Sequence, residues 1–144
     1  MIVLDASALV EVVVDQPNAA WVLEQITEEE ITAPAHQPAE ILSAIARLVR
    51  SAVLAPSAAR DALEEAPALP QRLVSPTTAH VRRAFTLRER IRVVDGLYVA
   101  LADELGCPLV TTDPRMAGAD APCEVRTPPA RPHQPRPIPA PRDQ

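Results

Sequence analysis

The chain begins with a short apolar run, Met-Ile-Val-Leu, that ends in an acid, Asp5, and small residues follow as a turn. A run this short, closed by a turn, is typical of a strand buried on both faces of a parallel sheet. Asp5 then lies at the carboxyl end of that strand, the edge at which open α/β sheets bind ligands. The sequence therefore predicts an α/β fold, with Asp5 as the first candidate for a functional residue.

Strand-like and helix-like segments alternate along the rest of the chain, and this alternation predicts a parallel sheet with helices on both faces. Short apolar runs predict strands, whereas longer segments with helical apolar periodicity predict helices. Strands are expected near residues 1–4, 31–33, 72–75, 109–112 and 123–125, and helices near residues 7–14, 19–26, 38–53, 56–63, 78–90 and 94–105.

The 144 residues divide into a globular domain over 1–126 and a Pro- and Arg-rich tail over 127–144. The prolines of the tail cannot join a packed core, so we expect an extended or disordered segment. The body has no apolar stretch of membrane-spanning length and no basic segment before its apolar start, so we expect a cytoplasmic protein without membrane association. Cys107 and Cys123 have no metal-ligand spacing and are expected to be reduced packing thiols.

The negative charge of the chain is concentrated in its body. The net charge is −5, and the tail carries three Arg against one Asp, so the tail is at +2 and the body at −7. An acidic body argues against a protein that passively coats nucleic acid. It suits a site that gathers carboxylates to hold divalent cations.

Four acids stand at the ends of predicted elements. Asp5 and Asp113 each close a strand, and Glu40 and Asp95 each open a helix. Any one of them is explained by the helix dipole or by chance, but four together predict a shared site at one edge of the sheet. Oxygen ligands suit Mg²⁺ or Mn²⁺, which lower the pKa of a bound water and clamp a phosphodiester. The matching reaction is phosphodiester hydrolysis.

Three hydroxyl residues are candidates to support that site. Ser7 can cap the helix after Asp5, or it can bind a carboxylate or a metal-bound water. Thr111 and Thr112 directly precede Asp113 and can orient an acid or touch a phosphate, although strand packing also explains such residues.

Arginines near two of the acids are candidates for phosphate contacts. Arg88, Arg90 and Arg92 belong to the most basic part of the body, and we interpret them either as contacts to an RNA backbone or as a solvated helix face. Arg47 lies seven residues after Glu40, nearly in line with it on a helix. It pairs with a site carboxylate, binds a phosphate, or is an ordinary surface arginine.

Four motifs surround the acids. They are Met-Ile-Val-Leu-Asp-Ala-Ser at the start, Pro38-Ala39-Glu40 with Ser43, Asp95-Gly-Leu-Tyr-Val-Ala-Leu-Ala102, and Leu109-Val-Thr-Thr-Asp113. In this order the motifs resemble those of PIN-domain ribonucleases, and most closely the VapC toxins of bacterial toxin–antitoxin pairs. The resemblance covers residues 1 to about 126.

The resemblance implies a three-layer α/β/α sandwich around a parallel sheet of four to five strands. It implies endonucleolytic cleavage of RNA that depends on Mg²⁺ or Mn²⁺, with an acidic quartet of Asp5, Glu40, Asp95 and Asp113. Asp5, Asp95 and Asp113 are the metal ligands in this interpretation. It also implies a homodimer that a cognate antitoxin silences.

Other families and functions fit less well. Phosphatases of the haloacid dehalogenase type require a second Asp at the position that Ser7 occupies here. Both these phosphatases and receiver domains also require a Lys, and the chain has no Lys. A catalytically silent PIN-like module that binds an antitoxin or RNA is the alternative that stays open, although none of the four acids is missing. Tyr98, one turn after Asp95, is interpreted as a core residue rather than a base contact.

Overall fold

The computed structural model describes residues 1–131, and within them five strands form one sheet. The strand order is β3-β2-β1-β4-β5, and every neighbouring pair is parallel. The strands are β1 (Ile2–Leu4), β2 (Ile31–Pro34), β3 (Arg72–Val74), β4 (Leu109–Val110) and β5 (Val125–Arg126).

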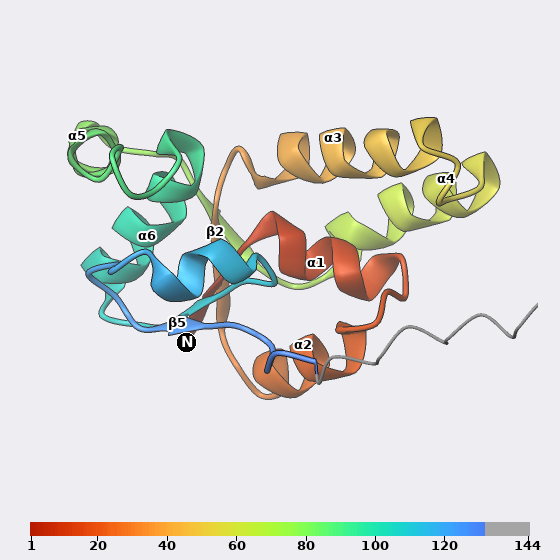
Figure 1. Ribbon diagram of the computed structural model, residues 1–144, viewed down its shortest axis with the longest axis horizontal. Helices are drawn as coiled ribbons and strands as arrows, with labels where there is room; N and C mark the ends of the chain where they lie inside the picture. Colours follow the sequence, from red (N-terminus) through yellow and green to blue (C-terminus); the bar gives the residue numbers. More distant parts are fainter. Residues whose placement is uncertain (132–144) are drawn as a thin grey trace, which may run out of the picture.

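Helices cover the sheet on both sides (Figure 1). Helix α6 packs against β1, β2 and β4 and against α5, whereas α1 packs against α2, α3 and α4. The predicted three-layer α/β/α sandwich is therefore confirmed. The helices are α1 (Ala6–Val13), α2 (Ala19–Ile26), α3 (Gln37–Arg50), α4 (Pro56–Glu65), α5 (Thr78–Thr86) and α6 (Val93–Leu105), with 3-10 helices η1 (Ala66–Ala68) and η2 (Pro114–Gly118).

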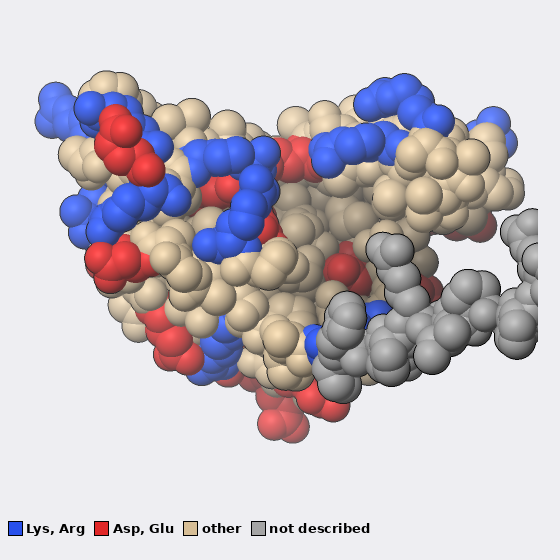
Figure 2. Space-filling view, viewed as in Figure 1, with Lys and Arg blue, Asp and Glu red and all other residues tan. Residues whose placement is uncertain are grey.

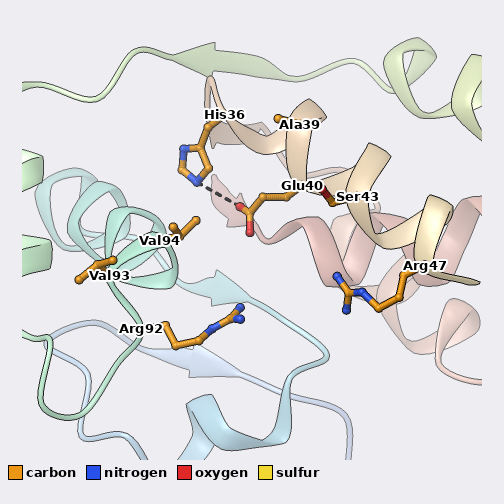
Figure 3. Close-up of a pocket in the computed structure, with 8 residues that line it drawn as sticks. All are labelled: His36, Ala39, Glu40, Ser43, Arg47, Arg92, Val93 and Val94. Atoms are coloured by element: carbon orange, nitrogen blue, oxygen red, sulfur yellow. Dashed lines mark ion pairs between the residues drawn. The ribbon is translucent and has the colours of Figure 1, made fainter.

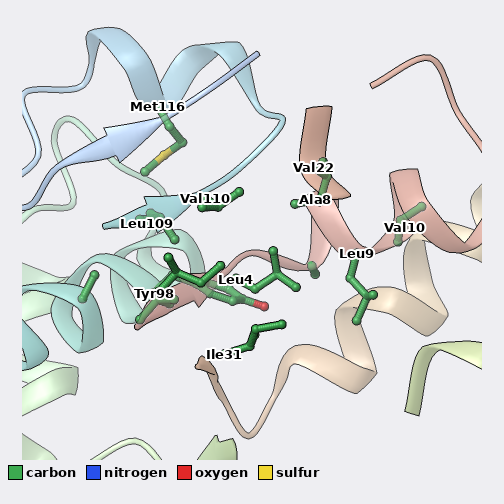
Figure 4. Close-up of a cluster of buried hydrophobic side chains, with 14 of the residues drawn as sticks. Leu4, Ala8, Leu9, Val10, Val22, Ile31, Tyr98, Leu109, Val110 and Met116 are labelled. Atoms are coloured by element: carbon green, nitrogen blue, oxygen red, sulfur yellow. The ribbon is translucent and has the colours of Figure 1, made fainter. Parts of the chain in front are cut away.

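Strand β1 lies at the centre of the sheet because its three residues are all apolar and all fully buried. It pairs with β2 on one side and with β4 on the other, where Leu4 lies opposite Val110. Figure 4 shows Leu4 and Val110 in the core together with Leu9 of α1 and Tyr98 of α6. The carboxyl ends of β1 and β4 consequently lie side by side.

A buried glutamine fixes the start of α3 next to the end of β1. Gln37 has no exposed surface, and its Nε2 donates a hydrogen bond of 2.9 Å to the backbone oxygen of Leu4. Gln71, just before β3, donates to Gln37 Oε1 at 2.6 Å. Because buried amides are costly unless paired, these bonds lock the position of α3. Glu40, in the first turn of α3, is thereby placed near Asp5.

The helix predicted over 78–90 is shorter in the structure. Helix α5 ends at Thr86, and the N–H of Leu87 is shared between the carbonyls of Arg83 and Ala84, which tightens the last turn. Leu87 and Ile91 are then buried, at 2% and 3% exposure, and turn the chain toward α6. Arg88 and Arg90 therefore lie on a connecting turn and not on a helix face.

Other boundaries differ by a few residues. Strand β4 ends at Val110, two residues before the predicted end, and α3 ends at Arg50 instead of residue 53. The predicted tail lies outside the described residues from 132 onward. Both cysteines, Cys107 and Cys123, are free, as expected. None of the helices within 1–131 has the length and apolar character needed to span a membrane.

Gly96 marks a close contact between α5 and α6. A Cβ built on Gly96 would lie 3.0 Å from both the Cα and the Cβ of Ala84. We expect Gly96→Ala to lower the free energy of unfolding by about 1 kcal/mol, because overpacking costs about 1–3 kcal/mol and better helix propensity offsets up to about 1 kcal/mol. Urea denaturation measures the change. Gly118→Ala is the control, since a Cβ there meets nothing within 4 Å; equal stability of the two variants would contradict the prediction.

Candidate functional site

Asp5 follows β1 directly, and its carboxylate is held by two hydroxyl groups. Thr111 Oγ1 donates to Asp5 Oδ2 at 2.6 Å, and Ser7 Oγ donates to the same oxygen at 2.7 Å. The residue is only 8% exposed. The structure thus brings two of the predicted supporting residues, Ser7 and Thr111, to the first candidate acid.

The same two hydroxyl groups connect the ends of β1 and β4. The N–H of Thr112 donates to Ser7 Oγ at 3.2 Å, and the N–H of Asp113 donates to Thr111 Oγ1 at 3.1 Å. The contribution of Thr112 to this network is its backbone N–H. The network fixes the path of the chain into Asp113, because each hydroxyl both donates to a carboxylate and accepts from a backbone group.

The charge of Asp5 is poorly compensated. Burial raises the pKa of Asp5 to about 6, and the hydrogen bonds from Thr111 and Ser7 offset only part of this effect. The negative charges of Asp95 and Glu40 raise the pKa further. These two acids therefore lie close enough to act on Asp5, and the three carboxylates form one electrostatic unit.

Glu40 is held by two residues that were not predicted as parts of the site. Tyr98 donates its hydroxyl to Glu40 Oε1 at 2.7 Å, and His36 Nε2 lies 3.1 Å from the same oxygen. Burial alone would raise the pKa of Glu40, but the nearby His36 ring and the hydrogen bond from Tyr98 outweigh burial, and the pKa lies below its ordinary value. Glu40 is thus kept ionised. The His36 and Tyr98 rings pack edge to face, with centroids 5.1 Å apart.

We expect Tyr98→Phe to weaken this arrangement while keeping the ring contact to His36. Loss of the hydroxyl removes a bond that lowers the pKa of Glu40, so that pKa rises and the acidic limb of the activity profile moves to higher pH. The free energy of unfolding should fall by about 1–3 kcal/mol, because a buried charged acceptor loses a donor. Cleavage rates between pH 5 and 8, and urea denaturation, measure the two effects; an unchanged pH profile would argue against the role of Tyr98.

Asp95 and Asp113 are each paired with an arginine close in sequence. Arg92 donates to both carboxylate oxygens of Asp95, at 2.9 and 3.3 Å. Arg115 binds Asp113 through Nε and through a terminal nitrogen at 2.7 Å, and this pairing lowers the pKa of Asp113. Both arginine side chains are largely exposed, at 64% and 68%. The spacing of three residues is a signal by which the sequence could have indicated the pair of Arg92 and Asp95, whereas the spacing of two residues between Asp113 and Arg115 carries no such signal.

The donor set fits a hard divalent cation, although the side chains are not in a ligating arrangement. Within 1–131 no group of three or more His, Cys, Asp or Glu side chains is placed to hold a metal ion. Asp5, Asp95 and Asp113 nevertheless supply only carboxylate oxygens, the ligand type that Mg²⁺ and Mn²⁺ prefer. Asp95 and Asp113 already bind a cationic group in this structure, the exposed guanidinium of Arg92 and of Arg115 respectively.

A cavity of about 700 Å³ opens beside the acids, between α3 and the start of α6. Figure 3 shows Glu40, Ser43 and Arg47 on the α3 wall and Arg92, Val93 and Val94 on the opposite wall.

Of the three arginines predicted to contact an RNA backbone, only Arg92 lines this cavity. The guanidinium carbon of Arg88 lies 4.2 Å from the centre of the Phe85 ring, and Arg90 pairs with Asp120 at 2.8 Å.

Comparison with known proteins assigns the chain to a family. The model of the PIN domain matches residues 2–122. Ribonuclease VapC12 of Mycobacterium tuberculosis is 39% identical over 117 residues, which cover 81% of this chain and 90% of the relative. Ribonuclease VapC3 of the same organism is 35% identical over 124 residues, or 82% and 86% of the two chains.

A solved structure supports the same fold. The crystal structure of Mycobacterium tuberculosis VapC20, a sarcin-ricin loop cleaving toxin, matches with a TM-score of 0.65 at 15% identity, and the match covers 84% of this chain and 96% of that one. The family match, the two relatives and this fold lead to one conclusion: the chain belongs to the PIN-domain family and is a homologue of the VapC ribonucleases of toxin–antitoxin systems.

Proposed function

We propose that this protein is a metal-dependent endoribonuclease that acts in the cytoplasm as the toxin of a type II toxin–antitoxin pair. The observation that carries the proposal is the environment of Asp5. A carboxylate that is 8% exposed, and whose pKa is raised to about 6 by burial with the help of two further acids, carries a buried negative charge at pH 7 that a bound cation would stabilise. Membership of the PIN-domain family and identity to VapC ribonucleases support RNA as the substrate.

In this proposal Asp5, Asp95 and Asp113 hold Mg²⁺ or Mn²⁺. When bound, the ion supplies an activated water and stabilises charge on the phosphodiester. Thr111 and Ser7 fix the Asp5 carboxylate, Arg92 holds Asp95 in place, and Arg115 holds Asp113 in place and keeps it ionised. Glu40 is held through Oε1, so that its other oxygen, Oε2, can accept a proton from the attacking water.

Protein partners are part of the same proposal. We propose a cognate antitoxin and a second copy of the chain as partners. Large apolar side chains on α3, on α5 and just after α3 support partner binding, because Leu42, Phe85 and Val53 are 54%, 59% and 66% exposed.

Cleavage of a mixed RNA pool by the purified chain tests the activity. We expect cutting with Mg²⁺ or Mn²⁺, loss of cutting in EDTA, and recovery when the metal is restored. The activity must co-elute with the protein on two unrelated columns, which excludes a contaminating nuclease. Cutting that persists in EDTA would contradict a metal-dependent mechanism. No cutting with either metal would favour the alternative of a catalytically silent binding module.

A further inference from the structure

The cavity beside the acids is walled by arginines on opposite sides. Figure 2 shows a hollow between two raised parts of the molecule, with acidic side chains in the hollow and arginines on both rims. In Figure 3 the side chains of Arg47, from α3, and Arg92, from the start of α6, extend into the space between the two helices. An anion that crosses this hollow would therefore meet positive charge on either side of the carboxylates.

Arg47 differs from the arginines that hold site acids. Glu40, Ser43 and Arg47 follow one another at steps of three and four, so they share one side of α3, and all three line the cavity. Arg92 is paired with Asp95, whereas Arg47 makes no ion pair with any carboxylate of residues 1–131. Its guanidinium is thus available to a ligand in the cavity.

The opposite wall adds an apolar surface to this charge. Val93 and Val94, next to Arg92, are 51% and 40% exposed and line the same cavity. Branched apolar side chains in this position can contact a ribose or the face of a base. The guanidinium group of an arginine such as Arg47 can bind two phosphate oxygens at once, which the compact ammonium group of a lysine cannot do in the same geometry.

Resting on the proposed function, we infer that this cavity is the subsite for an unpaired segment of the RNA substrate, with Arg47 as a ligand of a backbone phosphate. Arg92 faces the same RNA segment from the opposite wall of the cavity, where Val93 and Val94 contact a sugar or a base of the RNA. A cavity of about 700 Å³ has the size of a small ligand, and Asp5 and Asp95, which lie next to its lining residues Glu40 and Arg92, are each only 8% exposed. A duplex is too wide to reach such buried acids, whereas a splayed single strand can descend to them.

RNA binding tests the subsite separately from cleavage. The Asp5→Asn chain, which is expected not to cut, is titrated at fixed Mg²⁺ against a labelled, unstructured RNA oligonucleotide, over a series of salt concentrations. Adding Arg47→Gln should weaken binding about tenfold at low salt, because a charged hydrogen bond is lost. The slope of log affinity against log salt should fall by about 0.7, the value for one phosphate contact to a single strand.

Two matched variants and a competitor sharpen the measurement. Arg47→Lys should keep the salt slope but lose part of the affinity, since the charge stays and the fork geometry is lost. Arg72→Gln should change neither, because this exposed arginine opens β3 and lies at the end of the sheet away from the site. The oligonucleotide annealed to its complement should compete more weakly than the single strand.

The outcomes separate the subsite from the activity. If the wild-type chain cuts RNA but Arg47→Gln binds with unchanged affinity and slope, the subsite is overturned and the proposed function stands. If Arg47→Gln leaves RNA binding intact but changes the molecular mass in sedimentation, the cavity is a protein interface and the inference is overturned. If the wild-type chain neither cuts nor binds RNA, the proposed function fails, and the subsite fails with it.

Discussion

Asp5→Asn is expected to reduce RNA cleavage by about a thousandfold. Metal-ion catalysis contributes several kcal/mol of transition-state stabilisation, and each 1.4 kcal/mol or so corresponds to about a factor of ten in rate. An amide at this position keeps the shape of the side chain and its bonds to Ser7 and Thr111, but it removes the anionic ligand. The measurement is the initial rate of cleavage of one oligonucleotide in Mg²⁺.

The matched control for this variant is Asp61→Asn, which changes an exposed acid on α4 in the same way. Circular dichroism of both variants shows whether the fold is kept. Retention of cleavage by a folded Asp5→Asn chain would remove Asp5 from the site, whereas equal loss in Asp61→Asn would point to a general charge effect.

The same Asp5→Asn variant is expected to be more stable than the wild-type chain in EDTA at pH 7. The pKa of Asp5 is about 6 in the folded chain, against an ordinary value of 3.8, so the folded state binds more protons between these two values. Its stability therefore falls as pH rises from about 4 to 6, and above pH 6 the full penalty of the buried charge is present. The difference between the two pKa values corresponds to about 3 kcal/mol.

Urea denaturation in EDTA at pH 4 and at pH 7 measures this effect. The two chains should be similar near pH 4, where Asp5 is protonated in the folded state, and Asp5→Asn should be more stable by up to about 3 kcal/mol at pH 7. Addition of Mg²⁺ should then stabilise the wild-type chain more than the variant, because the cation compensates the buried charge. A variant that is less stable at pH 7 would mean that Asp5 is adequately paired without a metal.

Much of the fold follows from local sequence. The run from Ile2 to Leu4 has no polar residue, and it predicts a central parallel strand, which is where β1 lies. All five predicted strands are present, although β3 and β5 each include an arginine and are less buried than the three strands between them. Gly96 stands near the start of a helix, where glycine is unfavourable, and its close contact with Ala84 accounts for it.

The missed features depend on contacts between distant segments. Gln37 is fully buried, although glutamine is usually exposed, because the carbonyl of Leu4 and the amide of Gln71 become its partners only in the folded chain. Helix α5 ends at Thr86 without Gly or Pro, since burial of Leu87 and not local propensity turns the chain.

The sequence predicted the candidate acids and the two hydroxyl partners of Asp5, Ser7 and Thr111, but not the partners of Glu40. The positions of the four acids follow from strand ends and helix starts. The partners of Glu40 do not, because Tyr98 comes from α6, 58 residues away, and was interpreted as a core residue. It is both, since its ring is buried while its hydroxyl reaches the carboxylate. The roles of Asp5, Asp95 and Asp113 as metal ligands stay predictions.

The hydroxyl bond from Thr111 to Asp5 has a consequence for the order in which the ribosome produces this site. Asp5 is synthesised well before its donor, which follows 106 residues later. Until β4 is made, β1 lacks one of its two neighbouring strands, and Asp113 does not yet exist. A nascent or truncated chain that ends before Thr111 therefore has an incomplete acidic site. The proposed ability to damage RNA therefore cannot arise before the ribosome has added Thr111 and Asp113.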